Sequence, residues 1–254
     1  MLDKSKLSAP VSSANVSEDE IARFDALAES WWDPNGKYKT ALAFNAARVE
    51  HIVSAINKHF KPHGAADHLF NGLSILDVGS GGGLICEPLA KRGAEVTGID
   101  ASSVSVEVAK RHAQQRKLLV NYHHSLAGDW ARKGETYDVV INAEVVEHVP
   151  DQYALIQDCA AMVKPGGLLI LATINRTLKS YLVAIVGAEY IMRYLPVGTH
   201  DWRKFVTPKE MDEWVGEAFV RKSQCGFALN PMNKQWRQTS SVSVNYLCCY
   251  KHSA

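Results

Sequence analysis

Several features that would place this chain in a specialised class are missing from its sequence. It has five cysteines in 254 residues, with no Cys-x-x-Cys pair and no histidine at a spacing suited to zinc. An odd number of cysteines also argues against a disulfide framework. We therefore expect a reducing, cytoplasmic environment. The cysteines are Cys86, Cys159, Cys225, Cys248 and Cys249.

An excess of charge of one sign is also absent. The 28 basic residues are balanced by 27 acidic ones, and the net charge is +1. Without a global field to attract DNA or RNA, nucleic acid is not expected as a partner. The N-terminus contains acids and lacks the apolar stretch of a secretory signal. Residues 1–16 are therefore expected to form a flexible tail.

What is present is the composition of an ordinary globular protein, with 46% hydrophobic and 22% charged residues. The length favours one core domain, at 17–254, with additions. Two helices are predicted ahead of the first strand, within 17–62. The first runs from about Ser17 to Trp32 and opens with the capping-box pattern Ser17 to Glu20, and the second is amphipathic and ends before Pro62.

From residue 74 onward, short β-branched runs alternate with helical segments. Such alternation is typical of a doubly wound α/β domain, in which a mostly parallel sheet is covered on both faces. The last two runs have no helix between them and are predicted to pair antiparallel, after a short helix near 207–219. The expected strands are 74–79, 95–100, 119–124, 137–143 and 167–174, followed by 221–229 and 242–252.

The stretch ILDVGSGGGL, residues 75–84, joins an apolar strand to a glycine-rich loop. Glycines there let the backbone approach a ligand at the carboxyl edge of the sheet. Leu84 breaks the dinucleotide fingerprint G-x-G-x-x-G, and the Gly-Lys-Ser/Thr of a phosphate loop is absent. Asp100, 21 residues after Gly79, ends the next strand, where a carboxylate accepts ribose hydroxyls. With Asp77 placed to hold the loop or meet an ammonium group, the pattern favours a nucleoside that carries an amino acid.

This D-x-G-x-G-x-G pattern with an acid after the second strand resembles the S-adenosylmethionine site of class I methyltransferases, across about residues 74–175. The resemblance implies a Rossmann-like core and S-adenosyl-L-methionine as methyl donor. It also implies that Gly79, Gly81 and Gly83 contact that cofactor together with Asp77 and Asp100. The alternative interpretation is a glycine turn that serves tight packing only.

The segment INAEVVEHVPD places Glu144, Glu147 and His148 just beyond the fourth strand. If the segment makes a helical turn, these side chains share one face and could converge on Mg²⁺ or another divalent cation. A phenol must lose its proton as it attacks a methyl group, and either a cation or His148 as general base would assist. Glu144 and His148 are therefore the candidate catalytic residues. The alternative is that the segment serves cofactor and helix packing alone.

Three segments outside the core point to one family. FDALAESWWDP, NAARVEHI and NRTLKSYLVAIVGAEYIMRYLPVGTHDWRKFVTP together resemble the O-methyltransferases of ubiquinone biosynthesis, over nearly the whole chain. The resemblance implies that Arg48 meets the methionine carboxylate and that Ala143 lines the adenine. The chain departs from the family at Ala41-Leu42 and Asn45-Ala46, which leaves the substrate entrance less defined.

The resemblance implies methyl transfer to ring hydroxyls of polyprenylated catechols and quinols, with a ubiquinone-biosynthesis complex as a further partner. Such substrates lie in membranes. Ser180 to Ala188, within the insertion 176–206, is uncharged but shorter than the roughly 20 residues of a spanning helix. Residues 178–195 are expected to form an interfacial helix on the inner face of the membrane, with a buried lid as the alternative.

Other interpretations stay open at this level. Trp31 and Trp32 could line a substrate tunnel or plug the core. The methyl acceptor could be a quinone ring carbon or a soluble phenol, and the protein could be a non-enzymatic, cofactor-binding component of a complex. Analysis of the methylated product separates these functions.

Overall fold

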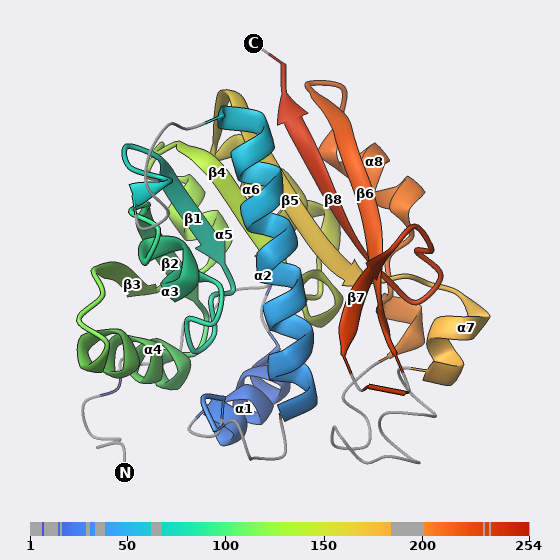
Figure 1. The fold of residues 1–254 in the computed structure, drawn as a ribbon, viewed down its shortest axis with the longest axis horizontal. Helices are drawn as coiled ribbons and strands as arrows, with labels where there is room; N and C mark the ends of the chain where they lie inside the picture. Colours follow the sequence, from blue (N-terminus) through green and yellow to red (C-terminus); the bar gives the residue numbers. More distant parts are fainter. Residues whose placement is uncertain are drawn as a thin grey trace.

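A mixed sheet forms the centre of the molecule, with helices on both faces (Figure 1). The structure is a computed structural model, and it describes residues 7, 15, 17–28, 31–33, 39–61, 68–183, 201–230, 232–233 and 235–253. Within these residues the sheet has eight strands in the order β3-β2-β1-β4-β5-β8-β6-β7. The strands are β1 Ser74–Val78, β2 Glu95–Asp100, β3 Val120–His124, β4 Tyr137–Ala143, β5 Val163–Ile174, β6 Phe219–Leu229, β7 Trp236–Thr239 and β8 Asn245–His252.

The strand directions confirm the doubly wound fold. Neighbours among β1 to β5 are parallel, whereas β8 pairs antiparallel with β5 and with β6. The predicted antiparallel pairing of the last two long runs is therefore correct. The short strand β7, antiparallel to β6, was not predicted. The chain leaves β1 toward β2 and β3 and returns as β4 on the other side of β1, so the sheet's topological switch point lies between β1 and β4, where open α/β sheets bind ligands.

Period-two alternation along the strands builds two separate cores. Ile75 packs on one face of the sheet with residues of α2, α3 and α4, and its neighbour Leu76 packs on the other with residues of α5, α6 and α8. All five cysteines are buried as free thiols. The helices are α1 Glu18–Leu27, α2 Lys39–Phe60, α3 Cys86–Ala90, α4 Ser103–Gln115, α5 Ala127–Ala131, α6 Gln152–Ala161, α7 Leu178–Ser180 and α8 Pro208–Val215, with 3-10 turns η4 Val146–His148 and η6 Trp202–Lys204.

The first helix differs from its prediction in two ways. It ends at Leu27 rather than Trp32. The hydroxyl of Ser17 caps it by accepting from the Glu20 backbone N–H, but the Glu20 carboxylate turns away from the cap. In α8, by contrast, Thr207 and Glu210 make both halves of a capping box. Glu20, which the sequence pattern predicts as a capping residue of α1, therefore contacts His148 instead.

The predicted interfacial helix lies mostly outside the described residues, which end at residue 183 and resume at 201. The expected tail 1–16 also lies outside them, except for residues 7 and 15. None of the helices in the described ranges combines the length and apolar character needed to cross a membrane.

Candidate functional site

The loop after β1 is held in a shape that only glycines adopt easily. Gly79, Gly81 and Gly83 all have positive φ angles, of 78°, 51° and 87°. A Cβ atom at Gly81 would overlap the ring of Trp31, and one at Gly83 would overlap the hydroxyl of Tyr122. These two glycines therefore make room for covering side chains rather than for the cavity wall, whereas Gly79 lines the cavity.

Asp100, at the end of β2, is the acid that fastens this loop. Its two carboxylate oxygens accept from the backbone N–H groups of Gly81 and Ser102, each at 2.8 Å. Burial raises the pKa of the Asp100 carboxyl, and these two backbone N–H groups oppose the shift without cancelling it. A carboxylate held in this way has lone pairs left for ribose hydroxyls.

Asp77, at the carboxyl end of β1, is only 2% exposed. Its carboxylate accepts from the Cys86 thiol at 3.2 Å. Burial raises the pKa of Asp77 to about 6, against the opposing effects of Cys86 and the positive charge of Arg48. An ammonium group beside this carboxylate would lower its pKa again, which suits the amino-acid end of a ligand.

Arg48 brings a buried positive charge from α2 to the same cavity. Its Nη2 donates to Asn45 Oδ1 at 2.6 Å, and its Nη1 lies 3.0 Å from Glu144 Oε1 as an ion pair. Within the described part of the chain, its Nε is buried without a hydrogen-bond partner. This guanidinium fits a ligand carboxylate.

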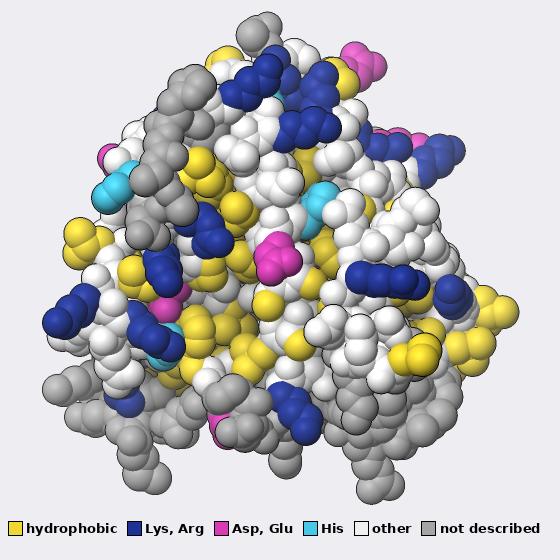
Figure 2. Space-filling view, viewed as in Figure 1, with side chains coloured by type: hydrophobic (Ala, Val, Ile, Leu, Met, Phe, Trp, Pro, Cys, Tyr) yellow, Lys and Arg dark blue, Asp and Glu magenta, His cyan; other side chains and the backbone are white. Residues whose placement is uncertain are grey.

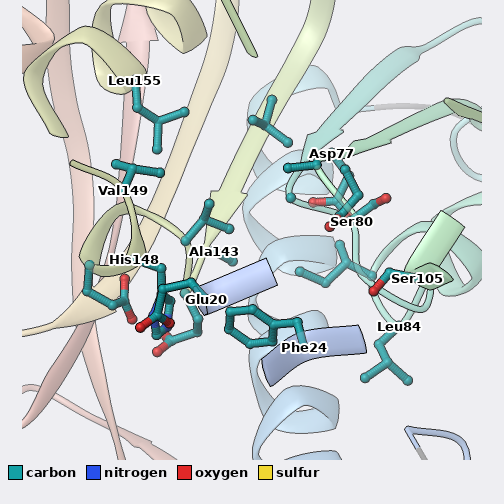
Figure 3. A pocket seen from close by; sticks show the side chains of 18 of the residues that line it. Glu20, Phe24, Asp77, Ser80, Leu84, Ser105, Ala143, His148, Val149 and Leu155 are labelled. Carbon is teal, nitrogen blue, oxygen red and sulfur yellow. The ribbon is translucent and has the colours of Figure 1, made fainter. Parts of the chain in front are cut away.

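These groups line a cavity of about 1060 Å³ between α1, α2 and the carboxyl edge of the sheet. In Figure 3, Asp77, Ser80 and Ser105 lie on one side, His148 and Glu20 on the other, and Ala143 between them. The hydroxyls of Ser80 and Ser105 are buried and have no hydrogen-bond partner among the described residues. Unpaired buried hydroxyls at a cavity wall are suited to a polar ligand. The volume exceeds that of a typical pocket for one small ligand.

Trp31 and Trp32 have different roles: one lines the cavity and the other packs against the core. Trp31 covers Gly81 and lines the cavity. Trp32 donates to the Gly82 carbonyl at 2.9 Å and stacks on His112, with ring centroids 3.6 Å apart. Trp32 is thus a packing residue, and Trp31 is part of the cavity wall.

The helical turn that would place Glu144, Glu147 and His148 on one face does not form. Glu144 has a φ of 58°, which is a left-handed conformation, and helical geometry is confined to the 3-10 turn η4. The side chain of Glu144 pairs with Arg48, and Glu147 accepts from the Thr173 hydroxyl at 2.8 Å. His148 is hydrogen-bonded through Nδ1 to Glu20, at 2.9 Å. All three residues line the cavity, but each faces a different partner.

This geometry does not make a metal-ligand set. No group of three or more His, Cys, Asp or Glu side chains within the described ranges is placed to hold an ion. The donor types suit a hard divalent cation, but the arrangement would have to change to receive one. Metal binding by Glu144, Glu147 and His148 stays a prediction.

Burial and charge act in opposite directions on His148. Burial alone would lower the pKa of its imidazole, but the hydrogen bond to Glu20 and the charges of Glu147, Glu20 and Glu144 outweigh it, so the pKa is raised above its usual value. The pKa of Glu20 is lowered in turn, chiefly by the hydrogen bond to His148. His148 is therefore placed to take up a proton in a site that stabilises its charged form.

Sequence reasoning missed Glu20, Ser80 and Ser105 as cavity residues. Glu20 carried a signal, because it lies four residues before Phe24 and so shares the apolar face of α1. A carboxylate on that face needs a partner in the protein interior. Ser80 and Ser105 carried no comparable signal, because serine is common in loops and at helix starts.

The chain is similar to known methyltransferases over its core and over its whole length. A family described as "Methyltransferase domain" matches residues 76–171. Solved structures with the same fold include a magnesium protoporphyrin IX methyltransferase from Synechocystis with bound SAH, at 20% identity and a TM-score of 0.63 over 93% of this chain and 100% of that one. A plantazolicin methyltransferase in complex with SAH has a TM-score of 0.62 at 16% identity, over 93% and 97% of the two chains. The fold and the glycine-loop site together define a class I S-adenosylmethionine-dependent methyltransferase.

Relatives of higher identity narrow the class to one family. A ubiquinone biosynthesis O-methyltransferase of Mesorhizobium japonicum is 45% identical over 92% of this chain and 94% of its own. The protein of the same name from Paramagnetospirillum magneticum is 46% identical over 91% and 93% of the two chains. The chain belongs to the family of ubiquinone biosynthesis O-methyltransferases.

Proposed function

We propose that this protein transfers the methyl group of S-adenosyl-L-methionine to a ring hydroxyl of polyprenylated catechols and quinols in ubiquinone biosynthesis. The observation that carries the proposal is one cavity with the carboxylates of Asp77 and Asp100 on one side and the imidazole of His148 on the other. The names of the relatives support O-methylation in ubiquinone biosynthesis. The volume accommodates a nucleoside and a ring together.

The cofactor-binding roles follow from the charges at the cavity wall. Asp100 accepts the ribose hydroxyls, and Gly79 lines the cavity beside them under the side chain of Val145. Asp77 faces the ammonium group, and Arg48 the carboxylate, of the methionine part. Ala143, at the end of β4, borders the adenine. Gly81 and Gly83 act indirectly, since they hold the loop in shape beneath Trp31 and Tyr122.

The chemistry requires a base on the acceptor side. When bound, the cofactor supplies an electrophilic methyl group on its sulfonium. As the hydroxyl oxygen forms its bond to that carbon and the carbon–sulfur bond breaks, His148 accepts the hydroxyl proton. Glu144 keeps Arg48 in place, and Glu147 adds negative charge beside the imidazolium that results.

We also propose that the protein contacts the membrane surface through residues around α7. Leu178, Leu182 and Val183 are 74%, 53% and 46% exposed, and they lie near the start of the insertion 176–206. Trp202, also exposed, donates its indole N–H to the Thr177 carbonyl at 3.0 Å, which joins the two ends of the insertion. Figure 2 shows exposed hydrophobic side chains beside lysine and arginine side chains on this side of the molecule, over α7. Such a patch suits an interface with anionic lipid.

The test is an assay of purified protein with a short-chain prenyl catechol and methyl-labelled cofactor, with Mg²⁺ or with chelator. We expect label on a ring oxygen, and loss of turnover in His148→Ala with cofactor binding retained. Label on ring carbon, or tight cofactor binding with no product from any catechol, would overturn the proposal. Activity that survives thorough chelation excludes an obligatory metal ion and leaves His148 as the base.

A further inference from the structure

A hydrogen bond joins the N-terminal helix to the proposed catalytic histidine across 128 residues of sequence. Glu20 Oε2, on α1, lies 2.9 Å from Nδ1 of His148, and the two side chains are 17% and 13% exposed. Figure 3 shows Glu20 and His148 next to each other at the edge of the cavity. A charge-assisted bond that is largely shielded from water is stronger than a surface ion pair.

The imidazole is held on more than one side. The ring of Phe24, one turn after Glu20, meets it edge to face, with centroids 5.1 Å apart and planes at 87°. The backbone N–H of His148 donates to the Val145 carbonyl at 2.9 Å, which fixes the start of the side chain. These contacts fix the side-chain rotamer of His148. Two of them, from Glu20 and Phe24, are made by α1.

The same helix is anchored on the cofactor side of the cavity. The carboxylate of Asp25 accepts from the Ser102 hydroxyl, and the backbone N–H of Ser102 donates to Asp100. Trp31, just after the helix, covers Gly81 of the glycine loop. α1 thus spans the cavity and holds the histidine relative to the cofactor site.

We propose that Glu20 is a positioning residue, which fixes the His148 imidazole through Nδ1 so that Nε2 is presented to the substrate hydroxyl. The inference rests on the proposed role of His148. A neutral imidazole that donates its Nδ1 hydrogen to a carboxylate has its lone pair on Nε2, and a carboxylate at Nδ1 holds that tautomer. Since α1 brings the carboxylate, the active site is complete only when the N-terminal helix is docked.

The experiment compares Glu20→Ala and Glu20→Gln with Glu18→Gln, a matched control from the exposed first turn of the same helix. In Glu20→Ala we expect kcat to fall roughly 10- to 100-fold, as activity does when a group that orients a metal-bound histidine is removed. The KM values for both substrates should change by less than about twofold, because no binding contact is lost. Glu20→Gln should keep more of the activity, since its amide oxygen still accepts from Nδ1, and Glu18→Gln should match the wild type.

Two outcomes would overturn the inference. One is a kcat of Glu20→Ala within about twofold of the wild type. The other is a loss of kcat in Glu20→Ala that comes with weaker cofactor binding and a lower melting temperature. That result would show that Glu20 only helps α1 to dock.

A second readout does not depend on turnover and so separates this inference from the proposed function. In the wild type, nuclear magnetic resonance should show a downfield Nδ1–H proton for His148, assigned by its loss in His148→Ala. That signal should be lost in Glu20→Ala and kept in Glu18→Gln. Its persistence in Glu20→Ala would overturn the inference even if His148 proves essential. If the signal behaves as expected but no catechol is methylated, the positioning inference stands and the proposed function fails.

Discussion

Single residues at this cavity combine structural and binding roles, and Asp77 shows the cost of doing so. Its pKa of about 6 in the folded protein compares with 3.8 for an ordinary aspartate. An acid whose pKa is raised on folding destabilises the fold at higher pH: below 3.8 the effect is absent, it grows as pH rises toward 6, and it stays constant above that. The difference between these two pKa values corresponds to about 3 kcal/mol of folding free energy.

Asp77→Asn should therefore make the cofactor-free protein more stable than the wild type at pH 7.5, by up to about 3 kcal/mol, while weakening cofactor binding. Urea unfolding at pH 4.5 and 7.5 measures the difference, which should shrink at the lower pH. A variant less stable than the wild type at pH 7.5 would contradict the predicted effect of Asp77 burial.

Asp100→Ala should weaken binding of S-adenosylhomocysteine, because ribose hydroxyls and the loop N–H groups lose one acceptor. Each bond to a charged group contributes about 1.5–3 kcal/mol, so one bond alone corresponds to roughly a 10- to 150-fold change in Kd. Calorimetric titration measures it. Glu107→Ala, on the exposed side of α4, is the control and should bind as the wild type does. Unchanged affinity in Asp100→Ala would exclude Asp100 as the ribose acceptor.

At the scale of elements, the glycine loop is defined by what covers it as much as by its own conformation. The sequence predicted a bare backbone after β1, and Gly79 does line the cavity, but the space of its missing side chain is filled by Val145. At Gly81 the space is filled by Trp31, from the segment between α1 and α2. The packing of Trp31 on Gly81 therefore joins the N-terminal region to the glycine loop of the core.

Gly81→Ala tests this coupling against Gly134→Ala, since Gly134 also has a positive φ, of 74°, but no atom of the described residues lies within 4 Å of the position of its missing Cβ. Both variants lose about 1 kcal/mol from the left-handed backbone, and Gly81→Ala should lose a further 1–3 kcal/mol or so by displacing Trp31. Chemical unfolding gives both values. In a Trp31→Ala background the difference between the two variants should shrink, and a constant difference would refute the packing explanation.

The whole molecule has an apolar patch at one end of its sheet, around α7 at the start of the insertion 176–206, and the proposed substrates are lipids. Leu182→Asp should weaken binding to anionic liposomes by about tenfold or more, since burial of one leucine contributes about 1.5–3 kcal/mol and the new charge is repelled. Leu119→Asp is the matched control, because Leu119 is 93% exposed and lies before β3, at the opposite edge of the sheet. Sedimentation with vesicles measures both. Equal liposome binding by the two variants would show that α7 is not part of the membrane-binding surface.

The sequence by itself determined the parts of this protein that depend on neighbours along the chain. Period-two strands, helical spacing and the glycines after β1 are local backbone preferences, so the parallel sheet and the placement of Asp77, Gly79 and Asp100 at its edge could be predicted. The local rule failed at Glu144, where a left-handed residue paired with Arg48 replaces the expected helical turn.

Only the tertiary structure decided which distant groups meet. The capping pattern of Ser17 to Glu20 predicted a local role for Glu20, but a partly buried imidazole 128 residues away is a stronger partner for its carboxylate than the helix terminus. The hydroxyls of Ser80 and Ser105, which have no hydrogen-bond partner among the described residues, can be recognised only when burial is known. Contacts of this kind arise because packing brings charges together at low exposure, where pairing is worth far more than in water, and no local pattern in the chain records that proximity.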